Sequence, residues 1–552
     1  MSVRLHFNGE TVDATPGQSL FTHAEQLGIP VPTSCNKNGK CKECVVEVVE
    51  GMEKLSSPDP AEKHLKGAFR LSCCARITAE AEGDVRCHTM RRGAMRIEKQ
   101  AFELPVHGPK WKLEPAVTRD GDRILLDGEE IDRSTGPIHG LAIDLGTTTV
   151  VMRLLNLETG EVIADSSFEN PQRFGGSDVM ARIQYDTDDR TKTLQRTLVG
   201  YLGRAIQEFP VDPRSIYEVV LAGNSTMRDM FFKLSVYSIG QSPYQSLTEL
   251  ELAEGKRTTT SLAEPARKLG LPIHPKARVY GLPIISGHVG ADAAACMLAV
   301  DVANEERLVA VMDIGTNTEL IVGNRHKVLA ASCPAGPAFE GGQITFGMPG
   351  LPGAIEKVKI DDATGAVNTT VIGEVEPGGI CGSGLVDLMS ELLRTGHMNV
   401  LGRFEHGTEF VVAKPRNGEP PITFNEADVN ALAQAKGANV AGLQIAFAEY
   451  GIQYSDLDVF YLAGGFGRHL NIEASKRIGL IPNIDAAKIV QVGNAAVEGA
   501  CIALLSVAKR AELERLVRHV VHCRLETHPG FFDFFVEGCQ FAPVGGSVEV
   551  RE

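Results

Sequence analysis

Residues 140–156 read GLAIDLGTTTVVMRLLN, and residues 308–323 repeat the design as LVAVMDIGTNTELIVG. Each stretch is an apolar run, an acidic residue, a short turn with glycine and threonine, and a second apolar run. This pattern predicts two buried strands joined by a tight turn. The backbone N–H groups and hydroxyls of such a turn can hold a phosphate group. Two copies so far apart predict a duplicated α/β fold that binds a nucleotide in a cleft between its halves.

The acidic residues of these stretches are candidate catalytic groups. Asp144 and Asp313 stand at strand ends and can orient Mg²⁺ through water, because Mg²⁺ keeps several waters and takes few carboxylates. A carboxylate must also position the attacking water. Asp292 and Glu319 are further candidates for that role, and the sequence does not choose among the four. The candidate phosphate-binding residues are Gly146, Thr147, Thr148, Gly315, Thr316 and Asn317.

A third glycine-rich stretch follows the two phosphate turns. Residues 459–467 read VFYLAGGFG, a buried strand that ends in glycines. Gly464, Gly465 and Gly467 would let the backbone approach an adenine or ribose closely. The alternative is that these are packing glycines of an unrelated α/β protein, and the order of the three elements argues against it.

Two further stretches are rich in small residues. Residues 287–300 (GHVGADAAACMLAV) and 493–505 (GNAAVEGACIALL) have helical length and few bulky side chains. They predict two helices rich in small residues, which are suited to close packing.

The N-terminal segment carries a separate signature, Cys35-x5-Cys41-x2-Cys44 followed by Cys73 in a Leu-Ser-Cys sequence. Four thiolates in this order can hold a [2Fe–2S] cluster. The loop between the first three is rich in Gly, Lys and Asn, and its N–H groups can hydrogen-bond the sulfides. Short strands near 3–7, 45–49 and 85–87, with a helix near 20–27, predict a ferredoxin-like domain.

A zinc site and redox-inactive thiols are the alternatives to a cluster. Zinc typically takes two short Cys-x2–4-Cys pairs, and only one pair here is short. The x5 spacing exceeds the plant-type spacing by one residue and resembles vertebrate-type and bacterial [2Fe–2S] ferredoxins. Cys73 fits the Leu-x-Cys pattern of the fourth ligand, and Cys74 stays open as a substitute. Cys87 and the scattered cysteines after it are interpreted as buried small hydrophobes.

Composition and charge restrict the class of protein. The chain has 552 residues, which predicts two to four domains. Its net charge of -15 argues against nucleic acid as a partner. No apolar run is long enough for a transmembrane helix, so no membrane is expected. The N-terminus lacks a hydrophobic signal core, and the scattered cysteines indicate reduced thiols, so a cytoplasmic location is expected.

These signals divide the chain into four parts: a ferredoxin-like domain at 1–90, a linker at 91–138, and two halves of the nucleotide-binding body at 139–300 and 301–552, the last with a C-terminal extension. In the linker, Asp127-Gly128 predicts a short hairpin. We expect the linker to let the N-terminal domain move; packing against the body is the alternative. Residues 520–541, with several phenylalanines, are expected to close the fold.

The three glycine-rich elements, in this order, resemble the acetate and sugar kinase/Hsp70/actin superfamily. With the N-terminal domain added, the chain resembles, over essentially its full length, the reductive activators of corrinoid-dependent enzymes. The stretches that carry this resemblance are 175–179 (GGSDV), 221–227 (LAGNSTM), 381–385 (CGSGL) and 462–467 (LAGGFG).

The resemblance implies a β-grasp [2Fe–2S] ferredoxin domain, a linker, and a duplicated ribonuclease H-like ATPase body of the actin and sugar kinase type. It implies an ATP-hydrolysing iron–sulfur oxidoreductase that uses Mg²⁺ and ATP. Such an enzyme returns the inactive Co(II) corrinoid of a methyltransferase system to Co(I). The implied partners are a corrinoid protein and a low-potential electron donor, with a homodimer as the implied assembly. Residues 223–227, Ser383 and 334–353 are candidate docking or gating loops.

Three other functions stay open. Activators of 2-hydroxyacyl-CoA dehydratases are also ATP-driven electron donors, but they share a [4Fe–4S] cluster between subunits and lack an appended ferredoxin domain. A redox-sensing switch would bind ATP without partner-stimulated turnover. A metabolite kinase is the weakest alternative, because nothing in the sequence marks a sugar site.

Overall fold

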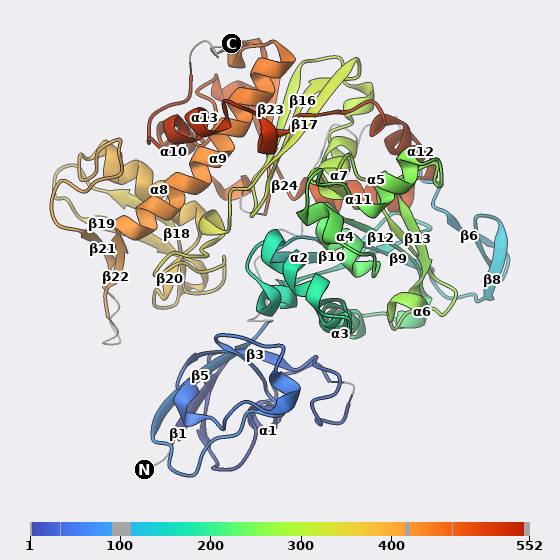
Figure 1. Cartoon of the computed structure of the whole chain (residues 1–552), viewed down its shortest axis with the longest axis horizontal. Coiled ribbons are helices and arrows are strands. Elements are labelled where there is room, and N and C mark those ends of the chain that lie inside the picture. Colours follow the sequence, from blue (N-terminus) through green and yellow to red (C-terminus); the bar gives the residue numbers. More distant parts are fainter. Residues whose placement is uncertain (1–2, 34, 91–111, 415–419, 466, 546–552) are drawn as a thin grey trace. The chain divides into compact units, whose positions relative to one another are not determined.

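The computed structural model describes residues 3–33, 35–90, 112–414, 420–465 and 467–545 (Figure 1). No helix within these ranges combines the length and the apolar character needed to cross a membrane. The chain divides into two compact units. The first unit contains Met1–Ala94, Pro115–Leu221 and Thr226–Gly281. The second contains Met95–Glu114, Ala222–Ser225 and Leu282–Glu552.

The first unit begins with a five-stranded sheet in the order β2-β1-β5-β3-β4 and one helix, α1 (Leu20–Gln26). Strands β1 and β5 are parallel, and the other neighbours are antiparallel. This is the expected β-grasp arrangement, and the predicted strands and helix are confirmed. The strands are β1 (Val3–Phe7), β2 (Glu10–Ala14), β3 (Val45–Glu50), β4 (Phe69–Leu71) and β5 (Gly83–Thr89).

A six-stranded sheet in the order β11-β10-β9-β12-β14-β13 follows in the same unit. The first phosphate stretch forms the antiparallel hairpin of β9 and β10, as predicted. The strands are β9 (His139–Leu145), β10 (Thr149–Asn156), β11 (Val162–Glu169), β12 (Ile216–Gly223), β13 (Leu262–Pro265) and β14 (Arg278–Gly281). The helices of this region are α2 (Val179–Asp188), α3 (Thr193–Glu208), α4 (Ser225–Phe231), α5 (Leu247–Ala253) and α6 (Ala266–Leu269).

The second unit repeats this sheet. Its order is β24-β23-β15-β16-β17-β25, so β17-β16-β15-β23-β24 corresponds strand by strand to β11-β10-β9-β12-β14. In each set of five, the hairpin strands (β11-β10-β9 and β17-β16-β15) are antiparallel neighbours, whereas β12 and β14, like β23 and β24, pair in parallel. The predicted duplication is therefore confirmed. The strands are β15 (Val309–Asp313), β16 (Thr318–Asn324), β17 (Lys327–Cys333), β23 (Val459–Ala463), β24 (Ile489–Gly493) and β25 (Val521–His522).

Part of the segment predicted as a linker is a small sheet of its own, β6-β7-β8. Its strands are β6 (Val117–Asp120), β7 (Arg123–Leu126) and β8 (Glu129–Arg133). Asp127 and Gly128 both have positive φ, as the predicted hairpin requires. Tyr217 of β12 donates a hydrogen bond of 2.7 Å to Asp132, so this sheet is attached to the body. The predicted linker mobility over residues 91–111 lies outside the described residues.

The two small-residue stretches form helices α7 (Ala291–Ala299) and α11 (Ala495–Leu505), as predicted. They pack so closely that a Cβ added to Gly499 would lie 2.0 Å from the carbonyl oxygen of Ala295. Only glycine permits this approach, which fixes α7 and the acidic residue Asp292 at its start.

Gly499→Ala is therefore expected to lower the free energy of unfolding of the second unit by about 1–3 kcal/mol, because the helices must separate. Urea denaturation of the full chain measures this loss. Gly378→Ala is the control, because no atom lies within 4 Å of a Cβ added there. Equal stability of the Gly499 and Gly378 variants would contradict the close packing of α7 and α11.

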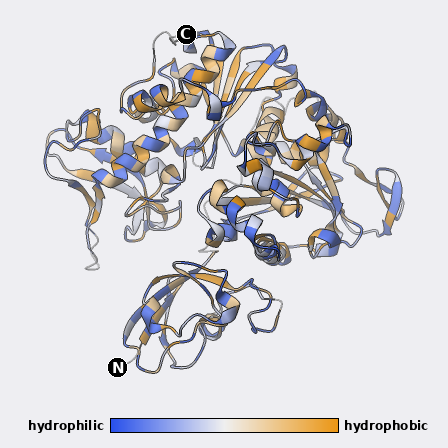
Figure 2. Cartoon of the chain, in the orientation of Figure 1, coloured by the Kyte–Doolittle hydropathy of each residue, from blue (hydrophilic) through white to orange (hydrophobic). Residues whose placement is uncertain are grey.

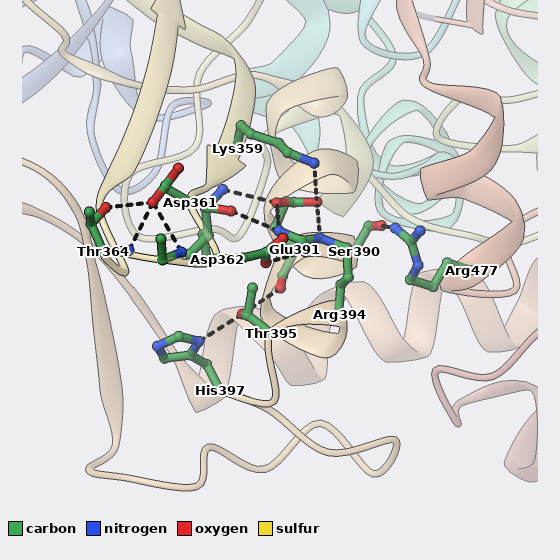
Figure 3. A network of polar contacts seen from close by, with 12 residues as sticks. Lys359, Asp361, Asp362, Thr364, Ser390, Glu391, Arg394, Thr395, His397 and Arg477 are labelled. Carbon is green, nitrogen blue, oxygen red and sulfur yellow. Dashed lines mark hydrogen bonds and ion pairs between the residues drawn. The ribbon is translucent and has the colours of Figure 1, made fainter.

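Helix α8 (Gly382–Arg394) carries the 381–385 motif and is fixed at both ends to strand β18 (Ala354–Ile360). At its start, a Cβ on Gly384 would lie 2.2 Å from the carbonyl oxygen of Ile355. At its end, Arg394 donates to Glu391 and to the carbonyl of Ile360, while Glu391 accepts from the Ile360 N–H (Figure 3). These contacts hold α8 rigidly. Strands β19 (Val367–Val371) and β20 (Gly379–Ile380) complete its sheet, and β21 (Glu409–Ala413) pairs with β22 (Ile422–Asn425).

The C-terminal residues close the second unit, as expected for 520–541. Helix α13 (Phe531–Gly538) packs on α9 (Glu426–Tyr450), and β25 extends the sheet. The buried Lys436 of α9 donates to the carbonyls of Gly538 and Gln540. Figure 2 shows hydrophobic residues along the strands of both large sheets, where the cores lie. The remaining helices are α10 (Ile472–Arg477) and α12 (Val507–Leu516).

Candidate functional site

The four predicted cluster cysteines form two pairs of thiols in the N-terminal domain. Cys44 donates to Cys73 across 3.3 Å, and Cys35 shares a hydrogen bond with Cys41. Two irons held by four cysteines need two such pairs. The observed donor set therefore fits a [2Fe–2S] cluster.

Hydrogen bonding distinguishes Cys73 from its neighbour Cys74. The hydrogen bond from Cys44 lowers the pKa of Cys73 to about 6, whereas burial raises the pKa of Cys74 to about 12. At Cys35, burial acts to raise the pKa, but hydrogen bonds, chiefly from the Cys41 backbone, outweigh it and bring the pKa to about 7. The same hydrogen bond raises the pKa of Cys44, so the geometry carries the choice: Cys73, whose thiol lies 3.3 Å from that of Cys44, is favoured as the fourth ligand.

A buried ion pair supports the strand that leads to Cys73. Arg70 donates from Nε to Oε1 of Glu62 at 2.9 Å and from Nη2 to Oε2 at 3.1 Å. Glu62 also accepts the N–H of Leu71 at 2.7 Å. Both charged side chains are buried. No sequence signal linked these two residues, because neither belongs to the cysteine motif.

Glu62→Gln is expected to lower the stability of this domain by about 3–5 kcal/mol, because it leaves Arg70 buried without a counter-charge. The measurement is the denaturant concentration at which the cluster absorption is lost. Glu50→Gln is the matched control, since Glu50 pairs with Arg86 on the surface and is worth at most about 1 kcal/mol. A Glu62 variant as stable as the Glu50 variant would contradict this role.

The first phosphate turn is held by a residue that the sequence did not reveal. The N–H of Gly146 donates to the carbonyl of Thr149 at 3.0 Å, and a Cβ on Gly146 would lie 2.6 Å from that oxygen. The buried Asn170 donates from its amide to the Gly146 carbonyl at 2.8 Å and from its N–H to the Thr148 carbonyl at 2.6 Å. Thr147 lies between these anchors. The turn is thus shaped before any ligand arrives.

The second phosphate turn contacts the adenosine stretch directly. The Ile314 N–H donates to the Ala463 carbonyl at 3.2 Å. Gly464 has a φ of 109°, and a Cβ there would lie 2.4 Å from the Ile314 carbonyl oxygen and 3.2 Å from Oδ1 of Asp313. Gly464 is therefore required both by its conformation and by its closeness to the acidic residue. Gly465 faces open space, as a close approach to a ligand requires.

Other contacts fix the loops around this turn. The carbonyl of Thr316 accepts from Gly336, and the Thr316 hydroxyl donates to Glu340. Gly315 and Asn317 complete the turn between β15 and β16. Beyond the adenosine stretch, the amide of Gln491 donates to three carbonyls, those of Gly467, Arg468 and Leu470.

Three acidic side chains of the second unit lie close enough for their charges to affect one another. Burial raises the pKa of Asp313 to about 6, and burial together with the charge of Asp313 raises that of Asp292 to about 7. Burial also raises the pKa of Glu319, and the charges of Asp292 and Asp313 add to the effect. The thiol of Cys296 donates to Oδ2 of Asp313 at 3.2 Å. A divalent cation would stabilise the charged forms of such a group.

The structure places Asp144 at the end of β9 in the first unit, at the position that corresponds to Asp313. Asp292 and Glu319 are buried, whereas Asp313 is partly accessible. Accessibility favours Asp313 for contact with a hydrated metal ion.

Two of the predicted docking loops are buried. Residues 223–227 have no exposed side chain, and Ser225 donates to the carbonyl of Ser286 at 2.7 Å. A Cβ on Gly290 would lie 2.5 Å from Cα of Asn224, next to Asp292. Ser383 is buried and donates to the carbonyl of Glu356. These buried residues do not form a docking surface, so the docking prediction is wrong for them, whereas a gating role stays a prediction. Docking by 334–353 stays a prediction.

Three family models match the chain in order. The 2Fe-2S iron–sulfur cluster binding domain matches residues 5–78, the RACo middle region residues 139–305, and the C-terminal ASKHA domain of RACo residues 307–547. A solved reductive activator for corrinoid, iron–sulfur protein is 27% identical, with a TM-score of 0.72 over 98% of each chain. The chain belongs to the RACo family.

Curated relatives of this RACo-family protein have related names. The corrinoid activation enzyme RamQ of Eubacterium limosum is 28% identical over 600 residues, covering 96% of this chain and 98% of its own length. The Co(II) methylated amine-specific corrinoid protein reductase of Methanosarcina barkeri is 25% identical over 422 residues, covering 72% of this chain and 76% of its own. The N-terminal match shows that this RACo-family chain has a [2Fe–2S] domain, and the ASKHA match shows that it has an ATPase body.

Proposed function

We propose that this protein is an ATP-dependent reductive activator of a corrinoid protein in a methyltransferase system. It takes one electron from a low-potential donor and passes it to the inactive Co(II) corrinoid, which becomes Co(I). One observation carries the proposal: a domain with two paired thiols and a duplicated ATPase body occur in one chain, in the order found in the RACo family.

The proposed roles of the residues follow from their positions. The cluster ligands are Cys35, Cys41, Cys44 and Cys73, and the bound [2Fe–2S] group supplies a one-electron centre of low potential. Asp144 and Asp313 orient hydrated Mg²⁺, and Asp292 or Glu319 positions the attacking water. The proposed nucleotide-binding residues are Gly146, Thr147, Thr148, Gly315, Thr316, Asn317, Gly464, Gly465 and Gly467.

ATP is needed because electron transfer from the cluster to Co(II) is thermodynamically unfavourable. Plant-type [2Fe–2S] centres lie near about −400 mV, and the Co(II)/Co(I) couple is expected to be more negative. Each 100 mV uphill costs about 2.3 kcal/mol per electron. A nucleotide can supply such an amount only if its two states bind the corrinoid partner differently. We therefore propose that ATP changes which conformation binds the partner.

The proposal is tested by adding candidate corrinoid proteins from the same cells, under anaerobic conditions, with a chemical reductant. Co(I) absorption that requires both MgATP and the cluster, together with partner-stimulated ATP hydrolysis, is the expected result. ATP binding without stimulated turnover, and cobalt that stays Co(II) with every partner, would favour the redox-sensing switch instead.

Two further points belong to this proposal. All twelve cysteines are described and none forms a disulfide, which supports a cytoplasmic location. A homodimer is proposed from the family resemblance alone.

A further inference from the structure

Within the first unit, one face of helix α3 holds the loop that carries the cluster cysteines. Three side chains of α3 donate hydrogen bonds of 3.2–3.3 Å to backbone carbonyls of residues in or next to this loop. The pairs are Arg196 with Lys40 and Cys41, Thr197 with Lys42, and Tyr201 with Val45. Thr197 and Tyr201 are one helical turn apart, so they face the loop together.

Apolar packing accompanies these hydrogen bonds. Cys44 and Cys73 belong to one hydrophobic cluster with Leu198 and Tyr201 of α3. At the centre of the contact, a Cβ on Gly200 would lie only 2.9 Å from Cγ of Glu43. The absence of a side chain at Gly200 therefore lets the helix backbone approach the loop.

Two contacts outside α3 extend the same interface. The hydroxyl of Tyr185 donates to the carbonyl of His64 at 3.2 Å, and Arg173 lies 3.5 Å from Glu47. The hydrogen bonds of this interface are 3.2–3.3 Å long, and their acceptors are neutral backbone carbonyls. Arg173 and Glu47 are the charged pair. Such contacts are typical of interfaces between domains that can separate.

We infer that α3 is the resting dock of the ferredoxin domain, and that the domain must leave α3 to pass its electron to the corrinoid partner. Cys41, Cys44 and Cys73 are each at most 5% exposed, and α3 contacts the C-terminal part of the loop, residues 40–45, whereas residues 36–38 are exposed. A protein partner has to reach this loop, because the loop encloses the electron donor. One electron passes from the reduced cluster to Co(II), giving Co(I), and the low-potential donor then restores the cluster. The inference rests on the proposed function for its last step.

A cross-link between positions 43 and 200 would hold the ferredoxin domain on α3. The Cβ of Glu43 lies 3.4 Å from a Cβ added to Gly200, near the separation of about 3.5–4.5 Å in a disulfide-bonded cysteine pair, so two thiols here lie within reach of a short bifunctional reagent. The double variant Glu43→Cys/Gly200→Cys, in the full-length protein with its cluster loaded, can be joined with dibromobimane. The resulting thioethers survive the reductant that the assay needs. The single variants show whether the added thiols disturb the cluster spectrum.

The cross-linked protein is expected to keep its cluster spectrum, chemical reduction of the cluster and basal ATP hydrolysis, but to lose corrinoid reduction. The same variant before cross-linking should retain corrinoid reduction. Equal corrinoid reduction before and after cross-linking would overturn the inference. So would failure to cross-link when both thiols react with a monofunctional maleimide, because the docked position would then not be occupied.

A second measurement does not depend on the corrinoid partner. Thr197→Val/Tyr201→Phe removes two donors to the loop and should speed reoxidation of the reduced cluster by cytochrome c, an oxidant of protein size. Arg204→Gln is the control on the same helix, because Arg204 is exposed and pairs only with Glu208 among the described residues. The parent protein can fail to reduce corrinoid while the donor variant is still reoxidised faster than the Arg204→Gln control. In that case the proposed function is wrong, but the docking of the ferredoxin domain on α3 is supported. Equal rates in the donor variant and the control would overturn the dock.

Discussion

Cys73→Ala is expected to abolish the visible absorption of the [2Fe–2S] cluster and all corrinoid reduction, while Cys74→Ala keeps both. Cys73 lies 3.3 Å from Cys44 and has the lower thiol pKa, about 6 against about 12 for Cys74. Because thiolates are the iron ligands, the loss of Cys73 leaves one iron with a single protein ligand. The neighbouring thiol of Cys74 is 3.8 Å from Cys73 and faces Gly39.

Iron content and anaerobic absorption spectra after reconstitution measure this effect. ATP hydrolysis serves as the folding control, since the ATPase body does not contain these cysteines. If Cys74→Ala lost the cluster and Cys73→Ala kept it, Cys74 and not Cys73 would be the fourth ligand.

Asp313→Asn is expected to reduce ATP hydrolysis by about 100- to 1,000-fold, the size of loss that follows removal of one preorganised group that stabilises a transition state. Asp313 ends β15, is partly accessible, and is placed by Gly464 on one side and by the Cys296 thiol on the other. An amide cannot hold hydrated Mg²⁺ as a carboxylate does. ATP-dependent corrinoid reduction should fall with it, while the cluster spectrum stays unchanged.

Comparison with Asp292→Asn and Glu319→Gln separates metal binding from water activation. The residue that positions water should lower kcat with little change in KM for MgATP, whereas a metal-orienting residue should change the requirement for Mg²⁺. Hydrolysis that is insensitive to Asp313→Asn would contradict the assignment of the second phosphate turn.

Much of the fold could be predicted because its signals are local. The acid-glycine-threonine turns predicted the hairpins β9–β10 and β15–β16, and the Asp127-Gly128 turn predicted β7–β8. The small residues of α7 and α11 predicted their close packing, which Gly499 makes possible.

The supporting residues could not be predicted, because their partners are distant in sequence. Asn170 holds a turn 24 residues away, and Gln491 holds carbonyls 21 to 24 residues away. Cys296 gave no signal beyond its apolar surroundings, and only the fold brings it to Asp313. Residues 223–227 are a candidate docking or gating loop from the sequence, because a short polar stretch does not reveal whether it is buried.

The most direct test of the account is a single-turnover experiment with the full-length protein. The protein is reduced, the excess reductant is removed, and the Co(II) corrinoid protein is added with or without MgATP. The account predicts that Co(I) forms only with MgATP, and that one reduced cluster is oxidised for each Co(I). Equal Co(I) without MgATP, or Co(I) formed by the Cys73→Ala variant, would contradict it.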